Sequence, residues 1–113
     1  MPQDTDCIFC KIVRGEIPST KVYEDEGHIT FEDISPKAPV HYLVVPKEHS
    51  PRLDAMAPGP VGSLLEAAVQ AAQVLGLDDY RLVVNVGAGA GQEVFHTHVH
   101  ILSGWQGAPG PLA

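Results

Sequence analysis

The chain has 113 residues, 44% of them hydrophobic, and a formal net charge of −7 at pH 7. This length and apolar fraction suit one domain with one core, whereas an acidic chain with only 7 basic residues disfavours binding to nucleic acid, whose phosphates attract clustered Lys and Arg. No apolar run approaches the ~20 residues that cross a bilayer, and the polar, acidic start is unlike a signal peptide, so we expect a cytoplasmic protein without a membrane partner.

Three short β-rich runs come first, and turn-forming segments separate them: residues 21–24, 29–33 and 40–45. Side chains alternate between the two faces of a strand, so Phe31 and Asp33 share one face of the second run. By the same rule His41, Leu43 and Val45 share one face of the third run. We therefore predict three antiparallel strands in which polar groups interrupt the apolar faces.

One long helix is predicted in the middle of the chain, after the break at residues 58–60. Pro60 suits the first turn and Gly76 the C-cap. Between them, apolar residues recur at helical spacing: Val61, Leu64, Leu65, Ala68, Ala72 and Leu75.

Two further strands are predicted over residues 81–86 and 94–102, and the glycine run 87–91 joins them. The tail from Gly104 is loop-like, and we see neither an internal repeat nor a domain linker. The sequence thus predicts an α+β domain in which a helix covers an antiparallel sheet.

Three histidines, His96, His98 and His100, fall on one face of the last predicted strand, about 6.6 Å apart in succession. A neutral imidazole is a good nucleophile toward phosphorus, and its neighbours can supply protons. A metal-binding strand face and merely solvated histidines are the two alternatives that the residues alone leave open.

The chain as a whole resembles the histidine-triad (HIT) nucleotide-binding family, and its zinc-bearing bacterial Hint branch in particular. The matching segments run from about Cys7 to Gly104: residues 7–12 with 15–18, then 31–36, 46–49, 84–85 with 91–92, and the triad followed by two apolar residues. The resemblance implies the HIT fold, a five-stranded antiparallel sheet with one long helix and a short N-terminal helix. It also implies that residues 1–113 are a single HIT domain, with a core of about 7–104 and a loop-like tail, 105–113.

The resemblance assigns roles to individual side chains. His98 matches the nucleophile that forms a nucleotidyl-histidine intermediate, later hydrolysed by water, and His100 matches the residue that contacts the phosphate and helps the leaving group depart. Asp33 matches the carboxylate that accepts hydrogen bonds from both ribose hydroxyls. An Asp that merely begins a turn before Ser35-Pro36 is the alternative interpretation.

The remaining nucleotide-binding positions form two sets. Apolar residues match the surroundings of the base, although core packing explains each nearly as well: Ile8, Phe9, Phe31, Ile34 and Leu43. Others match the contacts to the α-phosphate: Asn85, Gly91, Glu93 and Val94. Considered alone, this glycine-rich segment is equally compatible with a flexible hairpin connection.

Two departures from the Hint pattern concern specificity. Glu93 stands where eukaryotic Hint proteins carry a Ser that hydrogen-bonds near the leaving group. The short tail from Gly104 does not align cleanly with the Hint C-terminus, which reaches toward the site of the partner subunit. Leaving-group preference is therefore the property in which we most expect this chain to differ from the Hint proteins.

The pair Cys7 and Cys10 allows three interpretations: a thioredoxin-like redox motif, structural zinc, or two idle thiols. Only six residues precede Cys7, so the strand that introduces a thioredoxin motif is missing. The resemblance to zinc-bearing HIT relatives implies His49 and His96 as the two further zinc ligands. His41 matches a family histidine that orients the triad, and a satisfied, half-buried histidine is the alternative.

The leading hypothesis is a homodimeric HIT hydrolase that splits purine nucleoside 5′-phosphoramidates or related adenylates through His98, with structural zinc and no catalytic cofactor. A dinucleoside polyphosphate hydrolase is the enzymatic alternative, which His100 disfavours because that branch commonly has Gln there. A nucleotide-binding interaction module with incidental turnover and a zinc-dependent hydrolase using all three triad histidines are the others.

Overall fold

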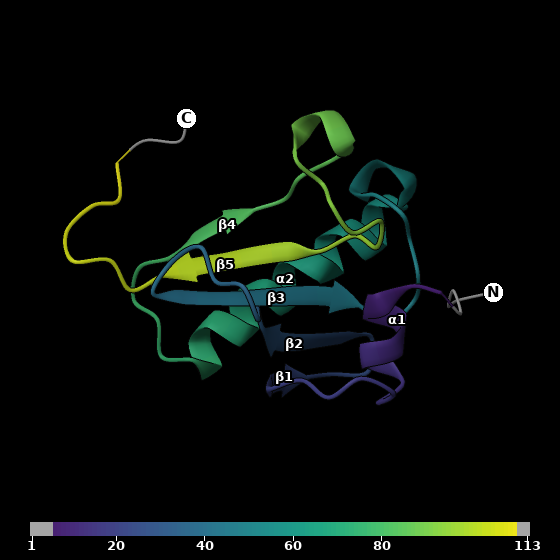
Figure 1. Cartoon of the computed structure of the whole chain (residues 1–113), viewed down its shortest axis with the longest axis horizontal. Coiled ribbons are helices and arrows are strands. Elements are labelled where there is room, and N and C mark those ends of the chain that lie inside the picture. Colours follow the sequence, from purple (N-terminus) through teal and green to yellow (C-terminus); the bar gives the residue numbers. More distant parts are fainter. Residues whose placement is uncertain (1–5, 111–113) are drawn as a thin grey trace.

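The computed structural model describes residues 6–110, which form an α+β fold with one five-stranded sheet (Figure 1). The strands are β1 (Lys21–Glu24), β2 (His28–Glu32), β3 (Val40–Pro46), β4 (Arg81–Val83) and β5 (Val99–Ser103). The helices are α1 (Ile8–Val13) and α2 (Pro58–Val74), and two short 3₁₀ turns cover Leu53–Ala55 and Ala88–Ala90. All neighbouring strands are antiparallel, in the order β1-β2-β3-β5-β4, which confirms the predicted architecture.

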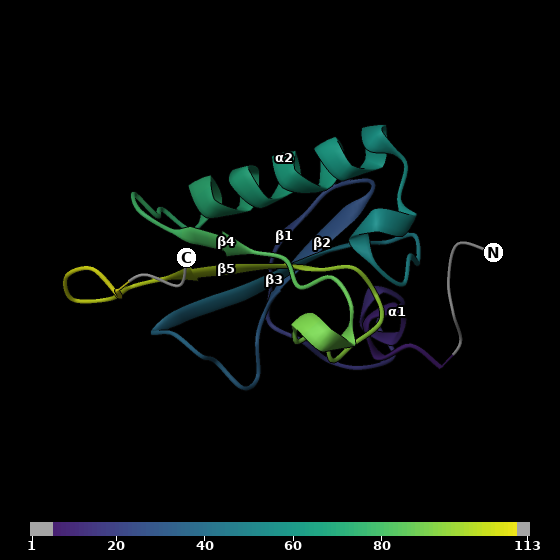
Figure 2. The same ribbon diagram turned by 90° about the horizontal axis from the view of Figure 1, so that it is seen from above.

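The long helix α2 covers one face of the sheet, as Figure 2 shows from above. Its small residues, such as Ala68 and Ala71, let the helix approach Val44, Val99 and Ile101 of the central strands closely. These side chains are fully buried. Burying each Val or Ile contributes about 1.5–3 kcal/mol, so this layer is a main source of stability.

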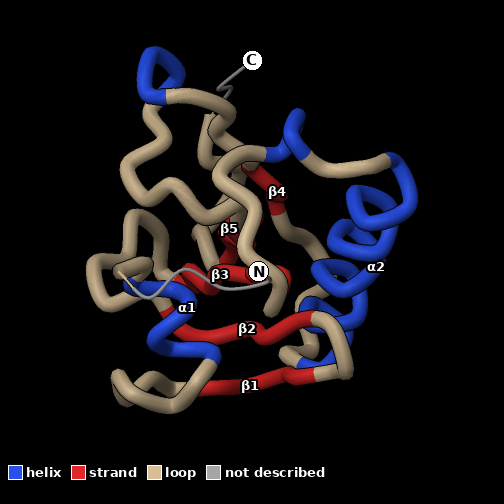
Figure 3. The backbone as a smooth tube through the Cα atoms, turned by 90° about the vertical axis from the view of Figure 1, so that its right-hand side faces the viewer, coloured by secondary structure: helices blue, strands red, loops and turns tan. Residues whose placement is uncertain are grey.

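The short helix α1 covers the opposite face of the sheet, so the strands lie between the two helices (Figure 3). Phe9 packs edge-on against Phe31, with 5.6 Å between ring centroids. Leu43 and Val45 complete this second core cluster. The predicted alternation along the strands is therefore confirmed, and His96 and His98, whose rings meet Phe9, lie on the α1 side of the sheet.

The ends of α2 differ slightly from the prediction. The helix begins at Pro58, and Leu75 occupies the C-cap. Gly76, which the sequence placed at the C-cap, is the next residue and has a left-handed φ of 72°. That conformation suits glycine, and it lets the N–H of Leu77 bond the carbonyl of Ala72 and end the helix.

The last two strands are shorter than predicted. β5 begins at Val99 rather than at residue 94, and β4 ends at Val83 rather than at residue 86. Continuing the β3–β5 register would place Thr97 opposite Pro46, which has no N–H to extend the ladder. The N–H of Thr97 bonds the carbonyl of Ser50 instead, so His96 and His98 precede the strand and only His100 lies in it.

The tail is irregular in its described part, residues 104–110, as predicted. Residues 1–5 and 111–113, which also belong to the predicted single domain, lie outside the described residues. Within 6–110, no helix combines the length and the apolar character that crossing a membrane requires.

Candidate functional site

His98 presents one ring nitrogen with an available lone pair. It lies just before β5 and is 7% exposed. Its Nδ1–H donates to the carbonyl oxygen of His96 at 2.7 Å, because a carbonyl can only accept. Nε2 therefore carries the lone pair. Burial lowers the pKa of His98 below its ordinary value and so favours the neutral, nucleophilic form.

His100, in contrast to His98, carries a proton on Nε2 and therefore presents a hydrogen-bond donor. The backbone N–H of Lys37 donates to His41 Nδ1 at 2.9 Å, which places the proton of His41 on Nε2. His41 Nε2 then donates to His100 Nδ1 at 2.8 Å, so the proton of His100 is on its own Nε2. That nitrogen is buried and has no hydrogen-bond partner among the described residues. Burial, reinforced by His98 and His41, lowers the pKa of His100 to about 4.

Asp33 follows β2 and contacts both a turn and a histidine. One carboxylate oxygen accepts the backbone N–H of Ser35 at 2.7 Å, which is the turn-initiating role that the sequence left open. The other oxygen lies 3.4 Å from His41 Nε2. The turn therefore leaves the second oxygen beside the histidines, where it can accept a further hydrogen bond.

A separate group of four side chains fits a metal ion. The ligand atoms of Cys7, Cys10, His49 and His96 all lie within 4.8 Å of one another. His96 Nδ1 is 3.3 Å from Cys7 Sγ, 3.5 Å from Cys10 Sγ and 3.2 Å from His49 Nδ1. Tetrahedral zinc, with Zn–S of ~2.3 Å and Zn–N of ~2.0 Å, separates such atom pairs by about 3.5 Å and 3.3 Å.

The orientation of His96 supports the same fit. Its Nε2–H donates to the carbonyl of Pro46 at 2.7 Å, which leaves the Nδ1 lone pair directed at the two thiols. Such outer hydrogen bonds hold metal-binding imidazoles in place. Burial lowers the pKa of His96 to about 4, and burial raises the pKa of the Cys7 thiol. Neutral His96 is the form that binds a metal ion, and a bound cation would lower the pKa of the Cys7 thiol again and favour the thiolate.

The apolar residues expected around the base separate into two sets. Phe9, Phe31 and Leu43 are buried in one cluster, and Val94 packs against it. Phe9 also meets the ring of His98 edge-on at 5.1 Å between centroids. Ile8 and Ile34, by contrast, are 45% and 95% exposed and lie outside this cluster.

The glycine-rich segment before the triad has a definite shape. Gly87 and Gly91 have left-handed φ values of 92° and 98°, which favour glycine. Asn85 lies beside Gly91, since a Cβ added there would be 3.9 Å from the amide carbon. Glu93 is exposed. The segment joins two antiparallel neighbours, β4 and β5, as the hairpin alternative expects, and a 3₁₀ turn occupies part of it.

Gln92 is a residue to which the sequence assigned no role. Its side chain is buried and accepts the N–H of Gly87 at 2.8 Å. Its amide nitrogen donates to the carbonyls of Pro51 and Val94 at 2.7 and 3.1 Å. Gln92 therefore fixes the loop that carries Glu93. The only signal in the sequence is a side chain with several hydrogen-bonding groups among glycines.

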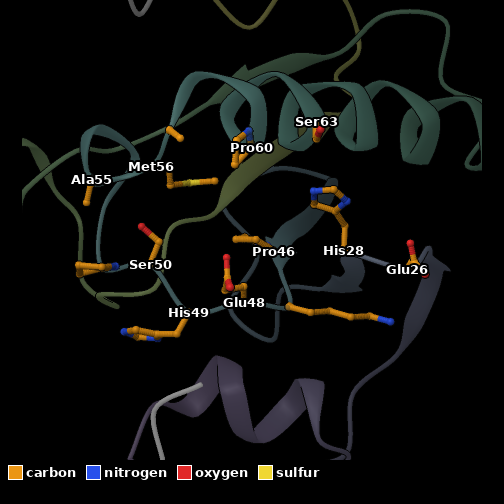
Figure 4. Close-up of a pocket in the computed structure, with 14 residues that line it drawn as sticks. Glu26, His28, Pro46, Glu48, His49, Ser50, Ala55, Met56, Pro60 and Ser63 are labelled. Carbon is orange, nitrogen blue, oxygen red and sulfur yellow. The ribbon is translucent and has the colours of Figure 1, made fainter. Parts of the chain in front are cut away.

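A hollow of about 830 Å³ lies beside the metal-ligand group rather than at His98 (Figure 4). His49 is the one candidate site residue that lines it, together with side chains such as His28, Met56 and Ser63. In Figure 4, His28 and Met56 point into the space below α2. Because neither His98 nor His100 borders this hollow, we do not place the reaction there.

Comparison with known proteins gives consistent matches. The model of the HIT domain matches residues 14–107. An uncharacterized HIT-like protein of Synechocystis sp. is 50% identical, over 88% of this chain and 90% of that protein. A HIT family hydrolase from Legionella pneumophila has a similar crystal structure, with 43% identity, a TM-score of 0.84, and coverage of 94% of this chain and 99% of that one. Adenylylsulfatase HINT3 of Arabidopsis thaliana is 41% identical over 86% of this chain, which spans 51% of that protein.

Proposed function

The chain belongs to the HIT domain family, and on that premise we propose that it is a nucleotide hydrolase of the Hint type, acting on purine nucleoside 5′-phosphoramidates or related adenylates. The similarity to a HIT family hydrolase and to an adenylylsulfatase supports hydrolysis of a nucleotide. The core of about 7–104 carries the activity, within a single domain of residues 1–113.

One observation carries the proposal: the reactive ends of two neighbouring imidazoles are complementary. His98 offers a lone pair at Nε2, and His100 offers a buried N–H without a partner among residues 6–110. Their ring centroids are 5.0 Å apart. A phosphate between them would meet a nucleophile on one side and a hydrogen-bond donor on the other, which is the arrangement that displacement at phosphorus requires.

In the proposed reaction, His98 Nε2 attacks the α-phosphorus, a P–N bond forms, and the bond to the leaving group breaks. A departing amine takes up a proton from water as it leaves, and the hydroxide left behind is neutralised by solvent. His100 donates its hydrogen bond to the phosphate or to the leaving atom and stabilises the charge that develops there. Water then hydrolyses the nucleotidyl-histidine, which releases the nucleoside monophosphate and restores His98.

The nucleotide is bound by groups around these two histidines. Phe9, Phe31, Leu43 and Val94 provide the apolar surroundings of the base, and the exposed Ile8 and Ile34 close over it. The second oxygen of Asp33 accepts the ribose hydroxyls. Asn85 and the backbone from Gly91 contact the α-phosphate, and Glu93 faces the leaving group. A carboxylate there disfavours anionic leaving groups.

A panel of substrates tests the proposal. We expect adenosine and guanosine phosphoramidates to be hydrolysed faster than dinucleoside polyphosphates. Adenylyl sulfate belongs in the panel because one relative is an adenylylsulfatase. Preference for dinucleoside polyphosphates would favour the enzymatic alternative instead. Tight binding of adenosine monophosphate without turnover of any substrate would favour a nucleotide-binding interaction module.

We propose that the metal-ligand group holds structural zinc. Its four ligands would close the coordination shell and exclude water, as in structural sites. The geometry argues against a hydrolase that uses all three triad histidines as zinc ligands, because His98 Nδ1 is bonded to a carbonyl and only His96 belongs to the group. Zinc would therefore support the fold and would not activate a nucleophile.

We further propose a homodimer. The outer surface of α2 exposes Leu65, Val69 and Val74, which are 40%, 37% and 60% accessible. The neighbouring β4 is an edge strand of three residues. A second copy would cover both, since exposed apolar surface and open strand edges favour association. Light scattering at micromolar concentration should give about twice the chain mass, whereas an active monomer would refute the dimer.

A further inference from the structure

We propose that the metal-ligand group of Cys7, Cys10, His49 and His96 is coupled to the reacting imidazole of His98, with Phe9 as the positioning residue. This inference rests on the proposed role of His98 as the nucleophile. It adds that the occupied metal group sets the ring orientation and the tautomer of His98, so that the group does more than stabilise the fold.

The first connection runs through the backbone of His96. Its side chain is held at both ring nitrogens, by the Pro46 carbonyl at 2.7 Å and by the neighbouring ligand atoms. Its own carbonyl accepts the Nδ1–H of His98 at 2.7 Å. The residue that binds the metal therefore also decides which nitrogen of His98 keeps its lone pair.

The second connection runs through α1. Phe9 lies between the two cysteines, and its ring stands edge-on to His98 at 5.1 Å and to His96 at 5.9 Å. The planes of Phe9 and His98 are almost perpendicular, at 86°. The ring is 6% exposed, so it occupies a fixed place in the core. Such an edge contact restricts the rotation of the imidazole.

The stability of α1 explains why the metal matters for this contact. A helix of six residues is too short to persist by its own hydrogen bonds. The side chain of Cys7 caps it by accepting the N–H of Cys10 at 3.4 Å. Buried Phe9 and Ile12, with Val13 packed against the same cluster, attach the helix to the sheet. Metal bound by both cysteines would tie α1 to His49 and His96 and hold Phe9 against His98.

The tautomer of His98 can be measured without any substrate. In protein with ¹⁵N-labelled histidine, long-range ¹H–¹⁵N correlation at about pH 8, well above an imidazole pKa of ~6.5, distinguishes Nδ1–H from Nε2–H. We expect only the Nδ1–H form in the zinc-loaded protein and a mixture after dialysis against a chelator. The affinity for adenosine monophosphate and kcat should each fall about fivefold.

A variant that keeps all four ligands gives a second test. Phe9→Leu should retain one zinc per chain and still show mixed His98 tautomers. Ile12→Ala is the matched control, because Ile12 is buried in the same cluster but has no ring that could stand edge-on to His98 as Phe9 does. It should lower the melting temperature by a similar amount and keep the single Nδ1–H form.

Three results would overturn the coupling: a wild-type protein that takes up no zinc, a folded chelated protein with unchanged His98 tautomer and nucleotide affinity, or a Phe9→Leu protein that behaves like Ile12→Ala. Absence of turnover in the zinc-loaded wild type would instead refute the proposed function. The tautomer measurement separates the two failures because it does not depend on catalysis.

Discussion

Two clusters of potential ligands flank His98. They differ in whether the central histidine directs a lone pair or an N–H into the cluster. The first is the metal-ligand group, and the second consists of Asp33, His41 and His100, whose nearest polar atoms also lie within 4.8 Å of one another. In the first, the carbonyl of Pro46 accepts a hydrogen bond from the Nε2–H of His96, so the Nδ1 lone pair faces the thiols. In the second, a backbone N–H occupies His41 Nδ1, so a proton on Nε2 lies between Asp33 and His100.

This difference indicates that the backbone partner of each histidine, together with the set of side chains, determines what a cluster can do. A lone pair directed at two thiols favours a cation, whereas an N–H in the same place favours a chain of hydrogen bonds. We therefore expect metal only in the first cluster and a directed hydrogen-bond donor, His100 Nε2–H, at the end of the second. The following experiments test that division.

Replacing the histidine between the clusters should have the largest effect. His98→Ala should lower turnover by at least about 10³-fold, because no other side chain can form the covalent intermediate. Adenosine monophosphate should still bind within about tenfold of wild type, or roughly 1.4 kcal/mol, since the pocket remains. Loss of both properties would point to misfolding.

The same experiment has a direct chemical readout. Label from an α-phosphate-tagged substrate, quenched in base and mapped by peptide mass spectrometry, should appear on His98. Label on His96 or His100, or a fully active His98→Ala protein, would contradict the mechanism.

Removing the donor at the end of the second cluster should have the next largest effect. His100→Ala should slow amine leaving groups by about 10²-fold and good leaving groups much less, because the hydrogen bond matters most where the departing atom needs a proton. Steady-state kinetics with a graded series of phosphoramidates measures this. His28→Ala is the matched control, since His28 bonds Asp25 away from the triad, and it should leave the series unchanged.

Breaking the first cluster should affect stability more than catalysis. Cys10→Ser should abolish stoichiometric zinc binding, because a serine cannot replace the thiolate ligand. It should also have the lowest melting temperature of this series, and each kcal/mol of stability lost corresponds to a fall of about 4–8 °C. The fall in kcat should not exceed about tenfold. His41→Asn, in the second cluster, should keep one zinc per chain by metal analysis. Native protein isolated without metal, and unable to take it up, would contradict the division.

The pH profile should reveal the burial of the triad. Burial lowers the pKa of His98, and the neutral form is the nucleophile, so activity is lost only when the pH falls below this lowered pKa. We expect kcat/KM to fall less between pH 7.5 and 6.0 than the roughly fourfold loss that an imidazole with an ordinary pKa of ~6.5 would show. A profile with its midpoint near pH 6.5 would contradict this, because it would show that water reaches His98 and that burial does not lower its pKa.

The smallest expected effect concerns the leaving group. Glu93→Ser should raise the ratio of activity on polyphosphates to activity on phosphoramidates about threefold, because a carboxylate repels an anionic leaving group. Glu66→Ser, on the exposed surface of α2, is the matched control. An unchanged ratio would mean that the side chain of Glu93 points away from the scissile bond.

The layers of the fold follow from local patterns in the sequence. Alternation along β2 and β3 and helical spacing in α2 depend only on near neighbours, so the two faces of the sheet could be predicted from them. The residues of the candidate site could be proposed from the sequence as well, because spacing and family resemblance single out the triad and the cysteine pair.

How those residues are used depends on contacts between distant parts of the chain. β5 is short because Pro46, about fifty residues earlier in the chain, cannot continue the ladder toward His98. The exposure of Ile34 has no local signature, and the contact of Gln92 with the distant Pro51 carbonyl cannot be inferred from its sequence neighbours. The tautomers of the histidines depend on single backbone groups that packing brings beside each ring. A sequence pattern records which side chains are present, whereas the position of a proton depends on which distant carbonyl or N–H each ring meets.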